Sequence, residues 1–171
     1  KKTRQWNRWQ TEVIPQLIQP YLAVLASSDF LSSIPPVSFP LCTCGLTSPS
    51  ISVTALSFAS LQPLKIQLCS CLPSAPQQLI SQALFPCAPV QPSLVVDLRL
   101  LEFASKVFLY ISPNSTAWCK AMEDFLLGLG FRLSREDSIR RRFENALRWY
   151  TTLKHHSTRF LTKHIENDRP A

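Results

Sequence analysis

The chain has 171 residues, a net charge of +7, six cysteines, 14 prolines and only three glycines. This length is sufficient to bury a hydrophobic core without disulfide staples, and the content of 46% hydrophobic and 17% charged residues excludes disorder throughout. Lys65 is the only charged residue between Asp29 and Asp97, whereas ten of the 18 basic residues lie from Arg132 onward. The sequence therefore divides into an apolar, cysteine-bearing front and a basic rear that permits an anionic partner such as nucleic acid.

No targeting or membrane segment is recognisable in this sequence. The N-terminus carries basic residues without the apolar stretch and cleavage site of a secretory signal. The most apolar stretch, residues 94–111, contains Asp97, Arg99, Glu102 and Lys106, and therefore indicates an amphipathic helix instead of a membrane span. We expect a reducing compartment, in which clustered cysteines bind metal or stay reduced more often than they form disulfides.

The first 27 residues predict an N-terminal helical arm. Apolar and aromatic residues recur there at steps of three and four, namely Trp6, Trp9, Val13, Leu17, Tyr21 and Leu25. Pro15 and Pro20 fall within this pattern, so a kinked or two-piece helix is expected. Residues 28–40 are rich in Ser and Pro and are predicted to form a linker.

Residues 41–92 are predicted to form a cysteine-cluster β region. Apolar and polar residues alternate over 51–55 and again over 64–68, which is typical of strands. We expect a small antiparallel sheet with a cysteine pair at each end. Residues 76–84 favour a short helix, and the proline-rich stretch 85–89 favours a turn.

Residues 93–165 are predicted to be helical. Ser93 is the expected cap of a first helix, and a second opens at Ser115 or Thr116 and closes at Gly128 and Gly130.

A third helix is predicted to start at Arg135 behind the N-cap Ser134. Its inward face comprises Ile139, Phe143, Ala146, Leu147, Tyr150 and Leu153. We expect residues 28–165 to form one folded unit and 166–171 a tail. The predicted fold class is α+β, with an N-terminal helix, a small antiparallel sheet carrying the cysteine pairs, and a C-terminal helical bundle.

The cysteine spacing is the strongest chemical signal. Cys42 and Cys44 form one Cys-x-Cys pair, Cys69 and Cys71 form another, and Cys87 follows in a Phe-Pro-Cys turn. Residues i and i+2 of a strand project to the same face, and four thiolates complete a structural zinc site. The pattern predicts bound zinc, with Cys87 as a further candidate ligand. The alternatives are small buried hydrophobes and redox-active thiols. Cys119, in the middle of a predicted helix, is assigned to the core.

A basic ridge is the second candidate site. Arg141, Arg148, Arg159 and Lys163 share the predicted solvent face of the third helix, where they could contact phosphate groups. The alternative is an ordinary solvated surface, because this helix also carries acidic residues. The neighbouring Trp149 could stack on a base or pack against another helix.

Motifs that carry catalysis are absent from the sequence. It contains no glycine-rich phosphate loop, no Gly-x-Ser-x-Gly elbow and no His-Glu-x-x-His motif. A cysteine nucleophile would need a nearby base, but His155, His156 and His164 all lie on the polar C-terminal helix or tail, where exposure is expected. We predict a noncatalytic protein without a small-molecule substrate.

The order of the segments resembles the Cys-x-Cys cysteine-cluster region, of the first subtype, associated with fungal KDZ transposases. The matching stretches are 9–22 (WQTEVIPQLIQPYL), the two Cys-x-Cys pairs, 84–89 (LFPCAP) with 92–93 (PS), 96–97 (VD) through 101–103 (LEF), 113–118 (PNSTAW) and 140–150 (RRRFENALRWY). The resemblance implies a noncatalytic, nuclear region that precedes an RNase H-like transposase domain. It also implies Cys42, Cys44, Cys69 and Cys71 as zinc ligands, with Cys87 as a fifth or a substitute.

The leading hypothesis is therefore a zinc-binding accessory module of a transposon-encoded protein, which assists DNA or partner recognition in the nucleus. In the alternative, the chain is a protein-interaction or structural domain whose apolar front docks on a downstream transposase domain, without direct nucleic-acid contact. A third hypothesis is an inert remnant of a mobile element.

Overall fold

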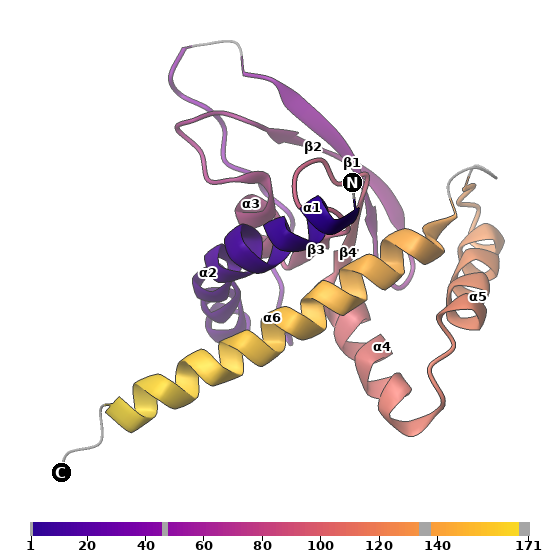
Figure 1. The fold of residues 1–171 in the computed structure, drawn as a ribbon. Coiled ribbons are helices and arrows are strands. Elements are labelled where there is room, and N and C mark those ends of the chain that lie inside the picture. Colours follow the sequence, from indigo (N-terminus) through magenta and orange to yellow (C-terminus); the bar gives the residue numbers. More distant parts are fainter. Residues whose placement is uncertain (1, 46–47, 134–137, 168–171) are drawn as a thin grey trace.

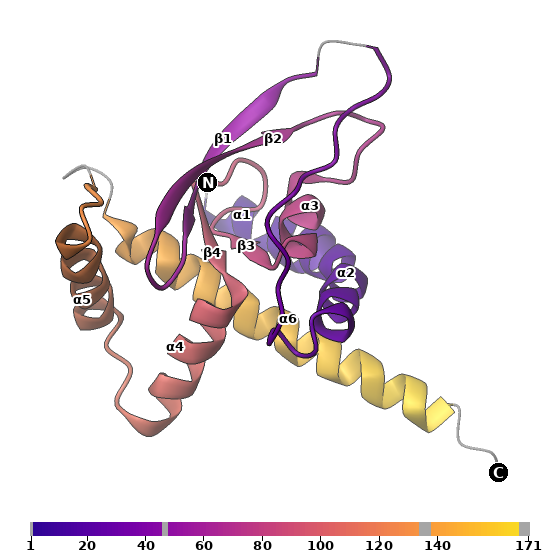
Figure 2. The same cartoon turned by 180° about the vertical axis from the view of Figure 1, so that it is seen from behind.

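A four-stranded mixed sheet lies between the helices in the computed structural model, which describes residues 2–45, 48–133 and 138–167 (Figures 1 and 2). The order across the sheet is β2-β1-β4-β3. The strands are β1 (Ser50–Leu56), β2 (Leu61–Gln67), β3 (Leu84–Pro86) and β4 (Leu94–Asp97). With an N-terminal helix and a set of C-terminal helices, this arrangement confirms the predicted α+β class.

The predicted antiparallel pair is formed by β1 and β2, with Ser50 opposite Gln67 and Leu56 opposite Leu61. The sheet is larger than predicted because two short strands join it. The chain leaves β2, passes through α3 (Ala75–Ser81) and β3, and returns as β4, which pairs parallel to β1 and antiparallel to β3. Residue 84, predicted as the end of a short helix, and residues 85–86, predicted as part of a turn, therefore form an edge strand.

The prediction of a helix that begins at Ser93 is wrong. Residues Leu94–Asp97 form β4, and helix α4 (Leu98–Tyr110) follows, capped by the Asp97 carboxylate, which accepts a hydrogen bond from the Arg99 backbone N–H at 2.7 Å. All four residues of β4 are buried. A central strand covered on both faces has a continuous apolar run without period-two alternation, which a sequence pattern does not separate from a buried helix.

The N-terminal helix changes its hydrogen-bonding pattern just before Pro15, as the sequence predicts. Helix α1 (Lys2–Arg8) leads into a π-helical segment, η1 (Trp9–Val13), and then into α2 (Ile14–Ser27). The Ile14 N–H donates to the Trp9 carbonyl, five residues back. Pro15 follows immediately, and its ring would clash with the carbonyl four residues earlier in a regular α-helix. Pro20 is accommodated inside α2.

The N-terminal helix packs into the same core as the sheet and α6 (Ile139–Asn167). The Trp9 ring stacks between Phe85 of β3 and Trp149 of α6, with ring centroids 5.7 Å and 5.2 Å away and interplanar angles of 6° and 14°. Residues 34–43 have no regular secondary structure, yet Ile34 and Phe39 pack against the two buried clusters. The predicted arm and linker are thus integrated with the rest of the fold.

The rear of the chain consists of α4, α5 (Ser115–Gly128) and α6. Asn114 caps α5 by accepting a hydrogen bond from the Ala117 N–H, and Gly130, with φ of +91°, follows its end. The expected N-cap Ser134 and start Arg135 lie outside the described residues. Helix α6 begins at Ile139, whose N–H donates a hydrogen bond to the Glu123 carboxylate of α5 at 3.0 Å.

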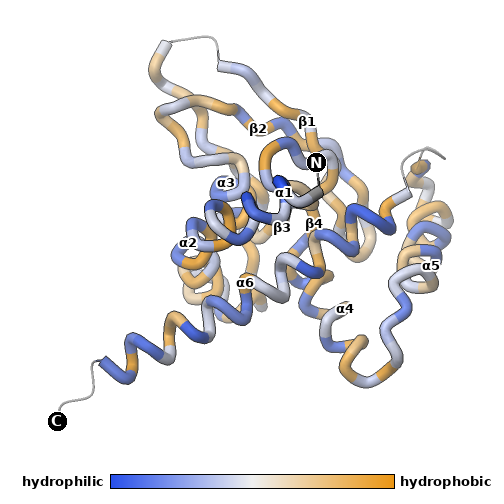
Figure 3. Tube along the Cα trace, in the orientation of Figure 1, coloured by the Kyte–Doolittle hydropathy of each residue, from blue (hydrophilic) through white to orange (hydrophobic). Residues whose placement is uncertain are grey.

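Helix α6 crosses the molecule, and its C-terminal half projects beyond the other elements (Figures 1 and 2). Its predicted inward face is confirmed, since Ile139, Phe143, Ala146, Tyr150 and Leu153 are buried and Leu147 is half-buried. The hydropathy colouring alternates along this helix in the way that such an amphipathic face requires (Figure 3). Among the described helices, none combines the length and apolar character needed to cross a membrane.

A polar network anchors α6 to α4 beside this core. The Glu102 carboxylate accepts hydrogen bonds from the Tyr150 hydroxyl at 2.9 Å and from Lys154, and lies 3.7 Å from the Lys106 ammonium. Burial by itself would raise the pKa of Glu102, but the hydrogen bonds from Lys154 and Tyr150 outweigh burial and hold the pKa below its usual value.

Glu102→Gln is expected to lower the free energy of unfolding at neutral pH by about 1.5–3 kcal/mol, because it removes a charged hydrogen-bond acceptor. This contribution is fully present above the unfolded-state pKa of about 4.3 and is lost as the pH falls through the lower native-state pKa. Chemical denaturation at neutral and acid pH measures the difference. Glu12→Gln, in an exposed pair with Arg8, is the control and should cost less than about 0.5 kcal/mol. If Glu102→Gln lowered the free energy of unfolding by the same amount at acid pH as at neutral pH, the ionised carboxylate would not be the source of the stabilisation.

Candidate metal centre

The pairing of β1 with β2 brings the two Cys-x-Cys pairs to one place. Ser50 at the start of β1 lies opposite Gln67 at the end of β2, and the Leu68 N–H extends the pairing to the Pro49 carbonyl at 2.8 Å. The chain before β1 and the chain after β2 therefore run side by side at the projecting end of the hairpin (Figure 1). The first segment carries Cys42 and Cys44, and the second carries Cys69 and Cys71.

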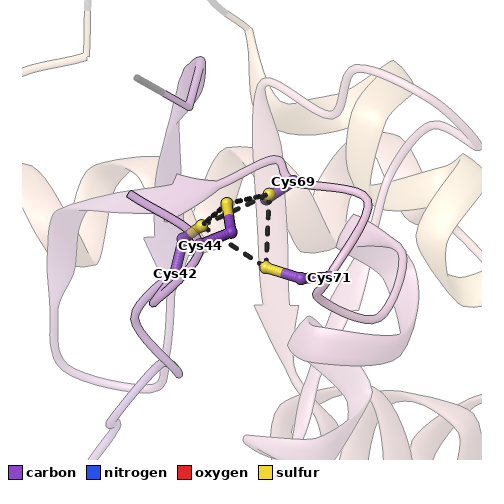
Figure 4. A group of neighbouring side chains, drawn as sticks. All are labelled: Cys42, Cys44, Cys69 and Cys71. Atoms are coloured by element: carbon purple, nitrogen blue, oxygen red, sulfur yellow. Dashed lines mark hydrogen bonds between the residues drawn. The ribbon is translucent and has the colours of Figure 1, made fainter. Parts of the chain in front are cut away.

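The four sulfur atoms of these residues converge on one another (Figure 4). The Cys42 Sγ lies 2.8 Å from the Cys44 Sγ and 3.3 Å from the sulfurs of both Cys69 and Cys71. The Cys69 Sγ lies 3.4 Å from that of Cys44 and 3.2 Å from that of Cys71. All four lie within 4.8 Å of one another and could hold a metal ion.

These separations fit one ion and no larger group. Zn–S bonds of about 2.3 Å place the sulfurs of a tetrahedral site about 3.8 Å apart, so the four sulfurs would move outward by a fraction of an ångström to receive zinc. An iron–sulfur cluster places several irons and bridging sulfides between its cysteines and requires a wider arrangement. Disulfide bonds require about 2.05 Å between sulfurs, and the six cysteines, all within the described residues, form none.

The four clustered cysteines are more exposed to solvent than the other two cysteines of the chain, which are buried. Cys44 and Cys71 are exposed, and Cys42 and Cys69 are half-buried. The interpretation of these four as small buried hydrophobes is therefore wrong, whereas it describes Cys119, which is buried in the core as predicted.

The structure does not bring Cys87, the fifth predicted ligand, to this cluster. Cys87 follows β3, its backbone N–H donates to the Leu94 carbonyl, and its side chain is buried in the core with Phe85 and Leu94. The Phe-Pro-Cys spacing does not show which way the thiol faces. In the fold that thiol belongs to the hydrophobic interior.

Two glutamines that the sequence patterns did not single out support the cysteine segments. The Gln67 Oε1 accepts a hydrogen bond from the Cys42 backbone N–H at 2.7 Å and so holds the first segment to the end of β2. Gln78 of α3 is 2% exposed, and its Nε2 donates to the carbonyls of Gln67 at 3.0 Å and Pro73 at 2.9 Å. These two carbonyls flank the second cysteine segment, so Gln78 spans the loop that carries Cys69 and Cys71.

Within that loop, the Leu72 N–H donates to the Cys69 carbonyl at 3.0 Å and forms a tight turn. Ser74 and Gln77 then form a capping box that starts α3. The only sequence signal for Gln78 is its position in the predicted short helix, directly before Leu79 and Ile80, which the structure buries fully. Outer-sphere groups of this kind orient metal ligands.

Hydrogen bonds shift the pKa values of the clustered thiols in opposite directions. The backbone of Cys71, with smaller contributions from Ser48 and other thiols, lowers the pKa of Cys69 to about 5. The Cys44 thiol, Ser48 and the Cys44 backbone lower the pKa of Cys42, whereas hydrogen bonds to Cys69 and Cys42 raise the pKa of Cys71 to about 12. Residues 41–45 and 68–72 contain no charged side chain, so these polar groups supply the local stabilisation of thiolate charge.

The donor set determines what the site can do. Four thiolates select a soft or borderline ion in tetrahedral geometry, and zinc is the typical one. A catalytic zinc keeps one coordination position for water or substrate, whereas four protein ligands close the site. The arrangement therefore suits a structural metal that ties two chain segments together.

The other candidate residues lie elsewhere. Arg141, Arg148, Arg159 and Lys163 are all exposed on α6, and the Arg148 guanidinium lies 5.8 Å from the centre of the Trp6 ring. Trp149 packs against the N-terminal helix, which decides between its two predicted roles. His155, His156 and His164 are exposed on α6, as expected.

Comparisons with protein-family models, with curated proteins and with solved structures find no match for this chain.

Replacing Gln78 by Leu is expected to weaken zinc binding by about 10- to 100-fold, because the second cysteine segment loses the amide that spans it. Competition with a chromophoric chelator measures the affinity. Gln82→Leu is the matched control, since the Gln82 Oε1 accepts a hydrogen bond from the Ser38 N–H at 2.7 Å, away from the cysteines. Equal zinc affinity of the Gln78 variant and the control would show that Gln78 does not support the site.

Proposed function

We propose that this chain is a noncatalytic zinc-binding module in which Cys42, Cys44, Cys69 and Cys71 hold one structural zinc ion. The convergence of four sulfurs from two distant chain segments carries the proposal. Four closely spaced thiolates repel one another, and a divalent cation among them offsets that repulsion. An unfolded chain does not hold these ligands together, so the free energy of metal binding contributes to folding.

Zinc would stabilise the part of the sheet that hydrophobic packing does not reach. The buried residues of β1 and β2 are Val53, Leu56 and Ile66, which lie within the strands, whereas the cysteine segments lie beyond the strand ends. Leu41, beside the first pair, is 75% exposed. A metal bridge between residues 42–44 and 69–71 would fix this end of the hairpin.

The biological setting proposed here is a transposon-encoded protein of the KDZ transposase type, which acts in the nucleus. The resemblance of the segment order to the Cys-x-Cys cysteine-cluster region supports this setting, and the donor set, which leaves no open position for catalytic water, supports only the noncatalytic role of the metal. In this setting the module assists recognition of DNA or of a protein partner, and a separate transposase domain performs catalysis.

Contact with DNA is assigned to the basic ridge of α6, formed by Arg141, Arg148, Arg159 and Lys163. All four side chains are exposed on the face of α6 opposite its buried residues. The outer half of the helix projects from the body, where a duplex can approach it (Figure 2). Such contacts would follow the phosphate backbone and add affinity without base specificity.

The second candidate function is a domain that docks on a downstream transposase domain without touching nucleic acid. Exposed apolar side chains in the front of the chain favour it, notably Phe30 at 80% and Leu41 at 75% exposure. The salt dependence of the affinity for duplex DNA separates the two candidates, because only the first predicts phosphate contacts.

Titration of the metal-free protein with zinc is expected to show one tightly bound ion per chain. Cys44→Ser and Cys71→Ser should each abolish tight binding, since each removes one of four ligands. Both residues are exposed, so neither substitution disrupts the core. Cys87→Ala is the matched control and should keep one ion per chain. A wild-type chain that binds no zinc, or four thiols that react fully in the presence of zinc, would refute the proposal.

Replacing the four ridge residues by Ala should reduce the slope of log affinity for duplex DNA against log salt by up to about 0.9 per lost phosphate contact. Fluorescence anisotropy over a salt series measures the slope. Lys65→Ala with Lys120→Ala is the control, because both side chains are exposed and lie off the ridge. An unchanged slope in the ridge variant would exclude this surface from DNA binding and favour the second candidate.

A further inference from the structure

Helices α4 and α6 enclose an open groove of about 290 Å³ on the surface. Phe108 and Leu109 line it from α4, and Leu147 and Thr151 line it from α6. Leu109 is 74% exposed, so the groove offers an apolar side chain that is accessible to a partner. A cavity of about 150 Å³ holds a benzene molecule, so this groove has room for about two large apolar side chains.

The groove continues as an uncovered stripe along α6. The stripe consists of residues spaced alternately by four and three positions, all exposed or half-buried: Leu147, Thr151, Lys154, Thr158, Leu161 and Ile165. The Thr151 and Thr158 hydroxyls donate to the carbonyls of Leu147 and Lys154 in their own helix, so both threonines have satisfied hydroxyls and leave methyl groups for contact. This spacing is that of a helix–helix seam.

Positive charge borders the groove. Lys106 and Lys154 line it from opposite helices, and both ammonium groups share a single carboxylate, Glu102. One positive charge is therefore not balanced at this wall. Arg159 and Lys163 lie on the basic ridge, on another side of α6, so the positive charge beside the groove comes from Lys106 and Lys154.

The geometry points to a docking site for an amphipathic helix of a partner protein, with apolar residues at three- and four-residue spacing and Asp or Glu beside them. Its apolar side chains enter the groove and follow the stripe toward Leu161 and Ile165. Its carboxylates face Lys106 and Lys154. Recognition of an apolar helix face by a groove between two helices is a recurring mode of protein binding. Docking of the same groove of a second copy is disfavoured, because two walls of net positive charge, each with Lys106 and Lys154 but only Glu102 as counter-charge, would face each other.

The test uses the full chain and a synthetic helical peptide with leucines at three- and four-residue spacing flanked by glutamates. Lys106→Glu and Leu109→Asp are each expected to weaken binding of this peptide by about tenfold or more, measured by fluorescence anisotropy. Lys65→Glu and Leu127→Asp are the matched controls, since both residues are exposed on other elements, and they should bind as the unaltered chain does. Circular dichroism confirms that each variant is folded.

Three outcomes would overturn the proposal. The first is no binding of the acidic peptide, and the second is equal binding of a peptide with lysines in place of the glutamates. The third is a dimer of the chain, detected by sedimentation, that Lys106→Glu and Leu109→Asp dissociate, because a second copy would then occupy the groove.

Discussion

The antiparallel pairing of β1 with β2 is the constraint on which the four-cysteine cluster depends. The register that places Ser50 opposite Gln67 brings the chain before β1 and the chain after β2 to the same end of the hairpin. Two cysteine pairs that are distant in the sequence meet there, and the Gln67 side chain can reach the Cys42 N–H. A slip of one residue would turn every side chain of a strand to the other face of the sheet and would separate these groups.

The centre of the sheet and the projecting end of its hairpin differ in the interactions that can stabilise them. Its centre is covered on both faces, with Leu56, Phe85 and Val96 in one buried cluster and Val53, Ile66 and Val95 in the other. This double burial accounts for the apolar residues of the central strands, whereas most of the uncharged residues over 35–45 are exposed. The projecting end of the hairpin has no such cover, and there the proposed zinc site would take the place of an apolar core. The basic rear corresponds to α6, which places one face in the core and exposes the other.

Much of this arrangement could be predicted from the sequence because it depends on local period or on spacing. Alternation over 51–55 and 64–68 indicates β1 and β2, and the cysteine spacing indicates a common site. Leu94 to Val96 were wrongly predicted as the start of a helix, since an apolar run has no period that separates a buried strand from a buried helix. The burial of Cys87 depends on the direction of a turn. The role of Gln78 depends on backbone carbonyls, which leave no side-chain pattern in the sequence.

The central claim is that four cysteine sulfurs bind one zinc ion. X-ray absorption at the zinc edge of the purified, zinc-loaded chain measures the ligands directly. The account predicts a single shell of four sulfurs at about 2.3 Å. A shell that includes nitrogen or oxygen at about 2.0–2.1 Å, or fewer than four sulfurs, would contradict it.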